Sequence, residues 1–327
     1  LTNSSVEAAN VDAIFNANGS GTIDFDSVNS MTGSLVDLQS VVTEASGASG
    51  VNFGHSIAAT VTDETVSDAS NLTTLQAGLS GGAVSSSTIT AVSGNDSQIG
   101  ALGTSISNNK IAIGNPAIEV TGTATVANIS KIAQDTSGVI TAEVDASTSV
   151  GDLLALPAED NKLDITIAAV ISGHNALDLT NIAARTALEV DAALVSKVTG
   201  TATELDNYLD ADIKFPTSSD IVVGSGTATV TQVNSYNTAA GSGSVSASVA
   251  DIASQTATLT TGAGDAIEVD VSNDSSATDA ADLNLTNGNT DTVVDAGAVT
   301  SILGSPGALV TLEAAATLET PTITLDS

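Results

Sequence analysis

Apolar residues recur along the chain in short sets spaced i, i+3 and sometimes i+6 or i+7, the spacing of one face of an α-helix. Each set covers about two helical turns. A helix this short is unstable alone, so we expect it to be held by packing against neighbouring elements. The seven clearest sets are Leu72/Leu75/Leu79, Ile99/Leu102/Ile106, Val126/Ile129/Ile132, Val150/Leu153/Leu154, Leu179/Ile182, Leu205/Tyr208/Leu209 and Val230/Val233/Tyr236.

Residues that favour helix N-caps stand just ahead of several of these sets. Their side-chain oxygens accept hydrogen bonds from the first free N–H groups of a helix. We therefore predict helix starts at Ser67-Asp68, Asn95-Asp96, Thr125, Thr203 and Thr229.

Between the helical sets, β-branched residues alternate with smaller or polar ones. This period of two is typical of short strands with one buried face. It predicts strands at residues 57–61, 89–92, 118–120, 140–144, 165–170, 221–223 and 267–269.

The phrase Gly-Thr-Ala-Thr occurs three times, at 122–125, 200–203 and 226–229. The separations are 78 (200 − 122) and 26 (226 − 200), and 78 is three times 26. The first members of the helical sets lie 24 (150 − 126) to 29 (179 − 150) positions apart, and near residue 230 the interval shortens to 19 (249 − 230). A recurring interval of this size is typical of a solenoid, in which each coil buries its apolar face against the next.

The pattern therefore predicts a β-rich α/β repeat solenoid. Parallel strands would stack along one side, with short capped helices or turns along the other, and the general rule for parallel crossovers makes it right-handed. We interpret residues 1–327 as one solenoid of about 12 coils of about 19–29 residues. The chain starts at Leu1, and its pattern begins and ends in mid-repeat. It is therefore interpreted as a processed chain or part of a longer protein.

The composition of the chain limits the classes of partner that we expect it to bind. The chain has 38 acidic and six basic residues, a net charge of −32, and no cysteine. Phosphate binding needs clustered Lys and Arg, so nucleic acid and anionic membrane surfaces are not expected partners. Apolar stretches such as 165–171 are far shorter than a bilayer span, so no membrane insertion is expected. Aromatic residues make up 2% of the chain, so Ala, Val, Ile and Leu must form the core.

Several phrases are similar to a known group of repeats. They are Ala8-Ala9-Asn10-Val11-Asp12-Ala13-Ile14, Ser20-Gly21-Thr22-Ile23-Asp24, the run from Met31 to Leu38 (MTGSLVDL) and the run from Ile113 to Thr123 (IGNPAIEVTGT). Together they resemble the Ala/Thr/Ser/Val-rich repeats of very large surface proteins of marine cyanobacteria, and similar repeats in the fibres of their phages. The resemblance implies a secreted protein with a structural or adhesive role.

The sharpest local motif, residues 16–27, reads like an EF-hand calcium loop. Oxygen-bearing side chains stand at the ligand positions, with Gly21 at loop position 6 and Ile23 at position 8. Position 12 is Ser27 in place of the bidentate glutamate, which weakens any site. The alternatives are a calcium site and a structural turn. The candidate ligands are Asn16, Asn18, Ser20, Thr22 and Asp24.

Other candidates each have a simpler reading. Acidic phrases at 94–96, 264–265 and 287–291 are either loose calcium sites or capped turns on a solvated face. The pairs Thr123/Thr125, Thr201/Thr203 and Thr227/Thr229 suggest an ice-binding array, but the two coils between 125 and 200 lack such a pair. His55 and His174 are read as two surface histidines rather than members of a Ser-His-Asp site.

These observations predict a non-enzymatic extracellular or cell-surface protein with no required cofactor, calcium being the one candidate. We expect it to self-associate, end to end or laterally, into a surface layer or filament. The alternative is an adhesin or phage tail-fibre segment that recognises a host or surface, with surface glycans as partners.

Overall fold

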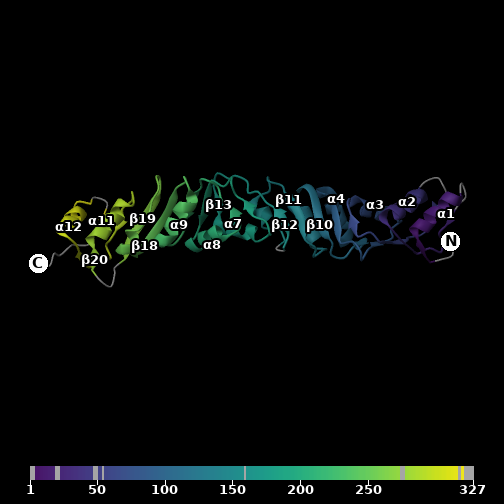
Figure 1. Ribbon diagram of the computed structural model, residues 1–327, viewed down its shortest axis with the longest axis horizontal. Coiled ribbons are helices and arrows are strands. Elements are labelled where there is room, and N and C mark those ends of the chain that lie inside the picture. The colour runs from purple at the N-terminus through teal and green to yellow at the C-terminus, as the bar shows by residue number, and fades with distance from the viewer. Residues whose placement is uncertain are drawn as a thin grey trace. The chain divides into compact units, whose positions relative to one another are not determined.

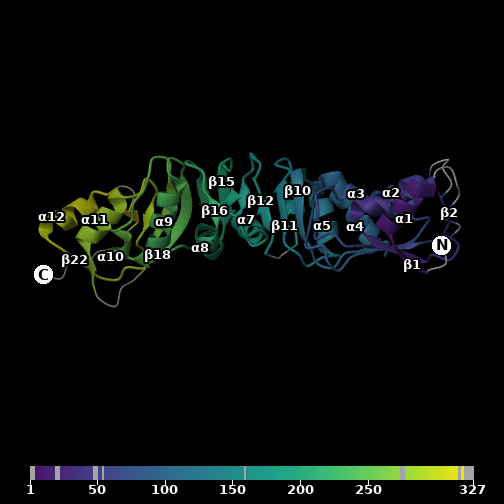
Figure 2. The same cartoon turned by 45° about the vertical axis from the view of Figure 1, so that its right-hand side comes forward.

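The computed structural model describes residues 4–18, 23–46, 51–53, 55–157, 160–272, 277–315 and 318–319. It divides into two compact units, described separately below. Unit 1 contains residues 1–165 and 184–188, and unit 2 contains residues 166–183 and 189–327. Both units combine parallel sheets with short helices, which confirms the prediction of an α/β chain (Figures 1 and 2).

Unit 1 has six helices in its described residues. They are α1 (Ala8–Asn18), α2 (Leu35–Ser46), α3 (Ser70–Gly78), α4 (Asp96–Ser107), α5 (Val126–Ala133) and α6 (Val150–Leu153). Its strands are β1 (Ser5–Glu7), β2 (Ile23–Asp24), β3 (Ser30–Gly33), β4 (Val51–Asn52), β5 (Ala58–Val61), β6 (Thr65–Val66), β7 (Val84–Ser85), β8 (Ala91–Asn95), β9 (Ile111–Ala112), β10 (Ala117–Ala124), β11 (Ile140–Val144) and β12 (Lys162–Asp164).

Unit 2 has six further helices in its described residues. They are α7 (Ala176–Ala183), α8 (Ala202–Asp210), α9 (Val230–Ala240), α10 (Ala253–Thr256), α11 (Ala280–Gly288) and α12 (Pro306–Glu313). Its strands are β13 (His174–Asn175), β14 (Val190–Asp191), β15 (Lys197–Gly200), β16 (Ile213–Lys214), β17 (Asp220–Val223), β18 (Val245–Ile252), β19 (Ala266–Ser272), β20 (Thr278–Asp279), β21 (Val294–Asp295), β22 (Ile302–Leu303) and β23 (Leu318–Glu319).

All pairs of these strands run parallel. Unit 1 forms the sheets β1-β3-β5-β7-β9, β6-β8-β10-β11-β12 and β2-β4, and unit 2 forms β13-β15-β17-β18-β19-β21-β23, β14-β16 and β20-β22. Paired residues are 20 (266 − 246, β18 with β19) to 28 (58 − 30, β3 with β5) positions apart in the chain. Each strand therefore pairs with a strand 20 to 28 residues later in the chain, and a stretch of this length is called a segment below.

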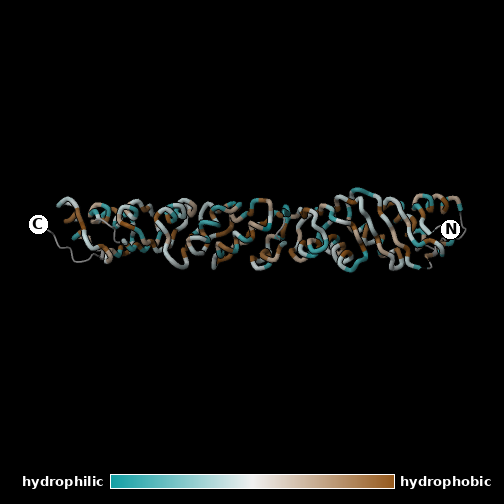
Figure 3. The backbone as a smooth tube through the Cα atoms, turned by 90° about the horizontal axis from the view of Figure 1, so that it is seen from below, coloured by the Kyte–Doolittle hydropathy of each residue, from teal (hydrophilic) through white to brown (hydrophobic). Residues whose placement is uncertain are grey.

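The helices pack in chain order beside the strands. In unit 1, α1 packs on α2, α2 on α3, α3 on α4 and α4 on α5. In unit 2, α7 packs on α8, and α11 packs on both α10 and α12. Helix α4 packs on β8 and β10. Ile99 and Leu102 of the predicted helical face and the inward residues Val92 and Ile118 of the two strands are all buried. Figure 3 shows the resulting alternation of hydrophobic and hydrophilic positions along the tube of both units.

Three of the predicted helix starts are confirmed by their cap geometry. Asn95, Thr125 and Thr229 each accept a hydrogen bond from the backbone N–H three residues later, at the starts of α4, α5 and α9. Ahead of α3 the structure differs, because the N-cap position is Ala69, which makes no side-chain bond, while Asp68 Oδ1 accepts from Ser70 N at 2.9 Å.

The three Gly-Thr-Ala-Thr copies play two different roles. In the first and third, glycine is left-handed (Gly122 φ +77°, Gly226 φ +79°) and the last threonine is the cap. In the second, Gly200 belongs to β15 and Thr201 is the cap, so the prediction of a cap at Thr203 is wrong. The reason is Glu204. It lies three residues after Thr201 and completes a capping box, its Oε2 accepting from Thr201 N at 2.8 Å.

Small residues allow a close approach between successive segments just ahead of four helices. A Cβ added at Gly33 or Gly304 would lie 2.9 or 2.8 Å from the Cβ of Ala8 or Ala280, one segment earlier. The corresponding pairs Gly94–Ala69 and Gly200–Ala176 would give 3.1 and 3.0 Å. Real Cβ atoms essentially never approach as closely as at Gly33 and Gly304, and seldom as closely as at Gly94 and Gly200, so the backbones here are spaced for glycine.

The strand predicted at residues 165–170 is wrong. Strand β12 ends at Asp164, and in the following residues Thr166 forms a single bridge to Asp191. The period of two did identify burial correctly, because Ile165 and Ile167 are both buried. Burying alternate side chains does not by itself require a ladder of backbone hydrogen bonds, and here the ladder is not formed.

Candidate functional site

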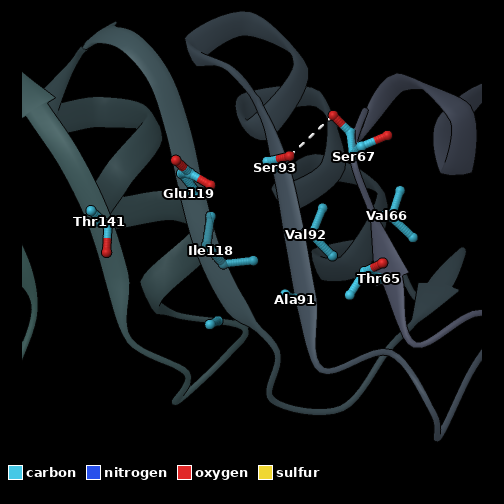
Figure 4. Close-up of a pocket in the computed structure, with 10 residues that line it drawn as sticks. Thr65, Val66, Ser67, Ala91, Val92, Ser93, Ile118, Glu119 and Thr141 are labelled. Carbon is cyan, nitrogen blue, oxygen red and sulfur yellow. Dashed lines mark hydrogen bonds between the residues drawn. The ribbon is translucent and has the colours of Figure 1, made fainter.

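A hollow of about 470 Å³ lies on the sheet of unit 1 formed by β6, β8, β10 and β11 (Figure 4). It is lined by Thr65, Val66, Ser67, Ala91, Val92, Ser93, Ala117, Ile118, Glu119 and Thr141. Its floor is the sheet itself, so its shape depends on which side chains of these strands point outward.

The strand alternation makes this surface hollow. The inward residues Val66, Val92 and Ile118 are buried. Thr65, Ala91 and Ala117 occupy the alternate positions and lie beside one another in register across three strands. Two adjacent alanines leave space above the sheet that longer side chains would fill.

A second row of outward side chains, two residues further along the strands, is polar. Ser93 is in register with Glu119, and Glu119 with Thr141. Figure 4 shows Ser67, Ser93 and Glu119 beside one another, and Ser93 Oγ donates to the Ser67 carbonyl at 3.0 Å. The hollow therefore combines a methyl-lined half with a row of hydroxyls and one carboxylate.

These groups are suited to hydrogen bonding with a hydroxylated molecule. The hydroxyls both donate and accept, and the carboxylate oxygens of Glu119 accept. The ten lining residues include no imidazole, thiol or amine, and the Ser93 hydroxyl donates to the Ser67 carbonyl.

Sequence reasoning missed this hollow, although the chain carries a signal for it. The outward residues repeat at the interval of the Gly-Thr-Ala-Thr phrase, as Thr65, Ala91 and Ala117 in one row and Ser67, Ser93 and Glu119 in the other. The sequence identified the interval, but it did not show that these particular segments pair side by side.

The candidate calcium loop lies partly outside the described residues. Ser20 and Thr22 belong to the segment that is not described. Asn16 and Asn18 lie in the last turn of α1, where Asn16 Nδ2 donates to Asp12 Oδ2 at 3.1 Å. Asp24 lies in β2 and its Oδ1 accepts from Asp26 N at 2.8 Å. Within the described ranges, no three His, Asp or Glu side chains converge to hold a metal ion.

The other acidic phrases take part in turns and in links between segments. Asp96 accepts from the backbone N–H of Thr125 at 3.0 Å, and Asp265 accepts from Val245 N at 2.7 Å and Gly262 N at 2.6 Å. Thr290 is buried and donates to the Ile267 carbonyl at 2.8 Å. These contacts favour the reading of the phrases as turns over that of loose calcium sites.

The threonine pairs and histidines are also placed by the structure. Thr125, Thr201 and Thr229 are helix caps, whereas Thr123 lies in β10 and Thr203 in α8, so the pairs do not share one strand position. The reading of both histidines as surface residues is wrong for His174. Its ring is buried, because β13 points it inward, and its Nε2 lies 3.0 Å from the Ala168 carbonyl oxygen. His55 is half-buried, and its Nε2 lies 2.7 Å from the Val28 carbonyl oxygen.

A polar cluster that sequence reasoning did not identify links α8 to α9 in unit 2. Tyr236 Oη lies 2.8 Å from the Ala202 carbonyl oxygen and 2.9 Å from Asp206 Oδ1, and Gln232 Nε2 donates to Asp206 Oδ2 at 2.6 Å. Burial, together with the bond to Asp206, raises the pKa of the Tyr236 hydroxyl above its ordinary value. These hydrogen bonds join α8 to α9, and the cluster is therefore interpreted as a structural link between the two helices.

Comparison of the chain with protein families, curated proteins and solved structures found no match. The helices of the described residues are all too short or too polar to cross a bilayer.

Proposed function

We propose that each unit is a solenoid, a stack of coils in which a strand and a short capped helix recur at the interval that separates paired strands. The pairing of strands one segment apart, all of it parallel, supports this reading. So does the packing of successive helices in chain order. A glycine lies close to the alanine about 25 residues earlier at four places in the chain. Such a recurring contact is expected if successive coils stack in the same register.

We further propose that the protein is a non-enzymatic structural component of an extracellular layer or filament. The observation that carries this proposal is the open edge of the parallel sheets. Within the described ranges, β6 and β9 each pair on one side only, with β8 and β7. An unpaired strand edge is a template for another chain. The net charge of −32 keeps single copies apart at low ionic strength, and salt removes that barrier.

The test is the assembly state of the chain as ionic strength rises to that of sea water. Sedimentation velocity and electron microscopy should show monomers at low salt and filaments or layers at high salt. A monodisperse monomer at high salt would overturn the proposal. Adding EDTA to the same samples tests calcium, because bound calcium predicts a lower melting temperature after chelation and an absent ion predicts no shift.

The hollow on unit 1 favours a second candidate, an adhesin or tail-fibre segment that recognises surface glycans. Its hydroxyl row and the Glu119 carboxylate offer hydrogen bonds to a sugar. A glycan array should then show binding that is lost in Ala91→Phe, which fills the hollow, and kept in Ala281→Phe, a matched change at an exposed position of α11. A trimeric mass would further favour a fibre over a filament.

A further inference from the structure

We infer that the hollow on unit 1 binds an extended oligosaccharide that carries free amino groups, with one ammonium group of the sugar held at the Glu119 carboxylate. This inference rests on the glycan-binding alternative proposed above, and it names the class of sugar and the residue that selects it.

The Glu119 carboxylate is the only charged group among the ten residues that line the hollow. No hydrogen bond or ion pair from the described residues reaches it. Ser93 lies beside it in register on β8, but the Ser93 hydroxyl points away from Glu119 and donates to the Ser67 carbonyl at 3.0 Å (Figure 4). The carboxylate oxygens of Glu119 are therefore open to a donor from outside the chain.

A second serine and glutamate in unit 2 show the contrast. Ser248 of β18 is in register with Glu268 of β19, as Ser93 is with Glu119. Here the serine does donate to the glutamate, with Ser248 Oγ 3.2 Å from Glu268 Oε2. Both glutamates are exposed at outward strand positions. Glu268 is therefore a matched control for Glu119, because it differs in having a donor within the chain and in lying away from the hollow.

The charges around the hollow favour a cationic ligand. Glu143 is exposed two positions after Thr141 on β11, and exposed Glu64 directly precedes β6. Lys162 is in register with Thr141 and is two strands from Glu119, about 10 Å at a strand spacing of about 4.8 Å. The carboxylates of Glu64, Glu119 and Glu143 outnumber this one ammonium group, and the chain as a whole has a net charge of −32. An anionic sugar is therefore repelled and an ammonium group attracted.

The rest of the hollow is suited to a sugar rather than a peptide. Ala91 and Ala117 present methyl groups on which the C–H face of a pyranose ring can lie. The hydroxyls of Thr65 and Thr141 can donate to and accept from the hydroxyls of the sugar. A peptide strand binds by pairing with a free sheet edge, but β8 and β10 are each paired on both sides.

The ligand should lie across the strands. Ser93, Glu119 and Thr141 stand in one row on three successive strands, which are about 4.8 Å apart. This spacing is close to the length of one pyranose residue in an extended chain, so successive sugars would meet successive strands. The volume of about 470 Å³ lies within the range of about 300–1,000 Å³ that small-molecule sites span, so the hollow would hold a short stretch of the oligosaccharide.

Isothermal titration calorimetry of the full chain with a linear glucosamine tetrasaccharide tests this inference. At about 0.15 M salt the Debye length is about 8 Å, so diffuse attraction to the net charge is largely screened. Glu119→Gln should weaken binding about tenfold or more, because it removes a hydrogen bond between charged groups. Glu268→Gln should bind as the wild type does. Both positions are exposed, so both variants should keep the wild-type circular dichroism and melting temperature.

Two further probes separate the charge of the ligand from its sugar rings. The fully N-acetylated tetrasaccharide has no ammonium group, so it should bind the wild type more weakly and should lose nothing further in Glu119→Gln. Tetralysine has the charge without the rings and should bind the wild type and Glu119→Gln equally weakly.

The outcomes that would overturn the inference differ from one another. If tetralysine binds as tightly as the glucosamine tetrasaccharide and loses as much in Glu119→Gln, the hollow selects a cationic peptide and the sugar is wrong. If the two glutamine variants lose equally, binding follows net charge and not the hollow. If both tetrasaccharides bind equally well and Glu119→Gln changes neither, the inference fails while glycan binding stands. If neither tetrasaccharide binds the wild type and the glycan array is also blank, the glycan-binding alternative fails with it.

Discussion

At the scale of single residues, the two tyrosines of unit 2 show how differently two buried hydroxyls can contribute. Tyr208 and Tyr236 are 2% and 0% exposed. Tyr236 Oη lies within hydrogen-bonding distance of Asp206 and the Ala202 carbonyl, whereas Tyr208 Oη has no partner among the described residues. A buried hydroxyl without a partner carries a desolvation cost that no bond offsets.

Removing each hydroxyl should therefore have a different effect on the free energy of unfolding. Tyr236→Phe leaves Asp206 with fewer donors and should lower the free energy of unfolding by about 2 kcal/mol, since the lost bond is to a charged group. Tyr208→Phe should leave it unchanged or raise it by up to about 1 kcal/mol. Urea unfolding followed by circular dichroism measures both. Equal losses in the two variants would show that packing, not hydrogen bonding, decides.

The same two groups predict a loss of stability in alkali. Burial raises the pKa of Tyr208 from 10.0 to about 12, and burial with the Asp206 bond raises that of Tyr236. Each raised pKa means that the folded state holds a proton that the unfolded state releases above pH 10. The titration of these two groups therefore leaves stability unchanged below pH 10 and lowers it as the pH rises towards 12, by about 1.4 kcal/mol per pH unit for each tyrosine. Unfolding midpoints measured across this range check the slope, and Tyr208→Phe should reduce it.

At the scale of elements, the start of α8 offers a matched pair of threonines. Thr201 caps the helix and Thr203 is exposed in its first turn. Thr201→Ala should lower the free energy of unfolding by about 1 kcal/mol, because it leaves the N–H of Glu204 without its acceptor. Thr203→Ala should change it by less than about 0.5 kcal/mol. Thermal unfolding of both variants distinguishes the capping role of Thr201 from a general effect of losing a threonine here.

The spacing between segments depends on glycine in a way that can also be measured. In Gly304→Ala the new Cβ would lie 2.8 Å from the Cβ of Ala280, so strand and helix must shift, and we expect a loss of about 1–3 kcal/mol. Gly288→Ala has no neighbour within 4 Å of the new Cβ and should be neutral or stabilising by up to about 1 kcal/mol. Denaturant unfolding compares the two. A neutral Gly304→Ala would mean that the segments can separate without cost.

Much of this fold could be predicted at the level of elements. The strand expected at 140–144 is β11 itself, and the sets at Ile99 and Val126 fall within α4 and α5. Three caps were also correct, because a cap depends on residues within one turn. In the second Gly-Thr-Ala-Thr, the cap was predicted at Thr203 but lies two residues earlier, at Thr201, because Glu204 completes a capping box with Thr201. The hollow was not predicted, since it depends on which strands pair across a whole segment of the chain.

At the scale of the whole molecule, charge should control both stability and association. With 38 acidic and six basic residues, most carboxylates have no basic residue to pair with, and their mutual repulsion opposes folding. Raising salt from 0.01 M to 1 M shortens the Debye length from about 30 Å to about 3 Å. The melting temperature should therefore rise steadily with sodium chloride. A melting temperature that does not respond would mean that this repulsion is no greater in the folded than in the unfolded chain.

The short reach of the strand pairing has a consequence for how the chain acquires its structure. In the described sheets, paired residues are at most 28 positions apart in the chain (58 − 30), so the partner of each strand lies within the next stretch of that length. Contacts so local in sequence favour rapid folding, because little loop-closure entropy is lost in making them. A chain that emerges one end first, from a ribosome or through an export channel, can therefore fold in order of arrival. Each new strand and helix can pack on those that have already folded, so no long unfolded stretch accumulates that could aggregate.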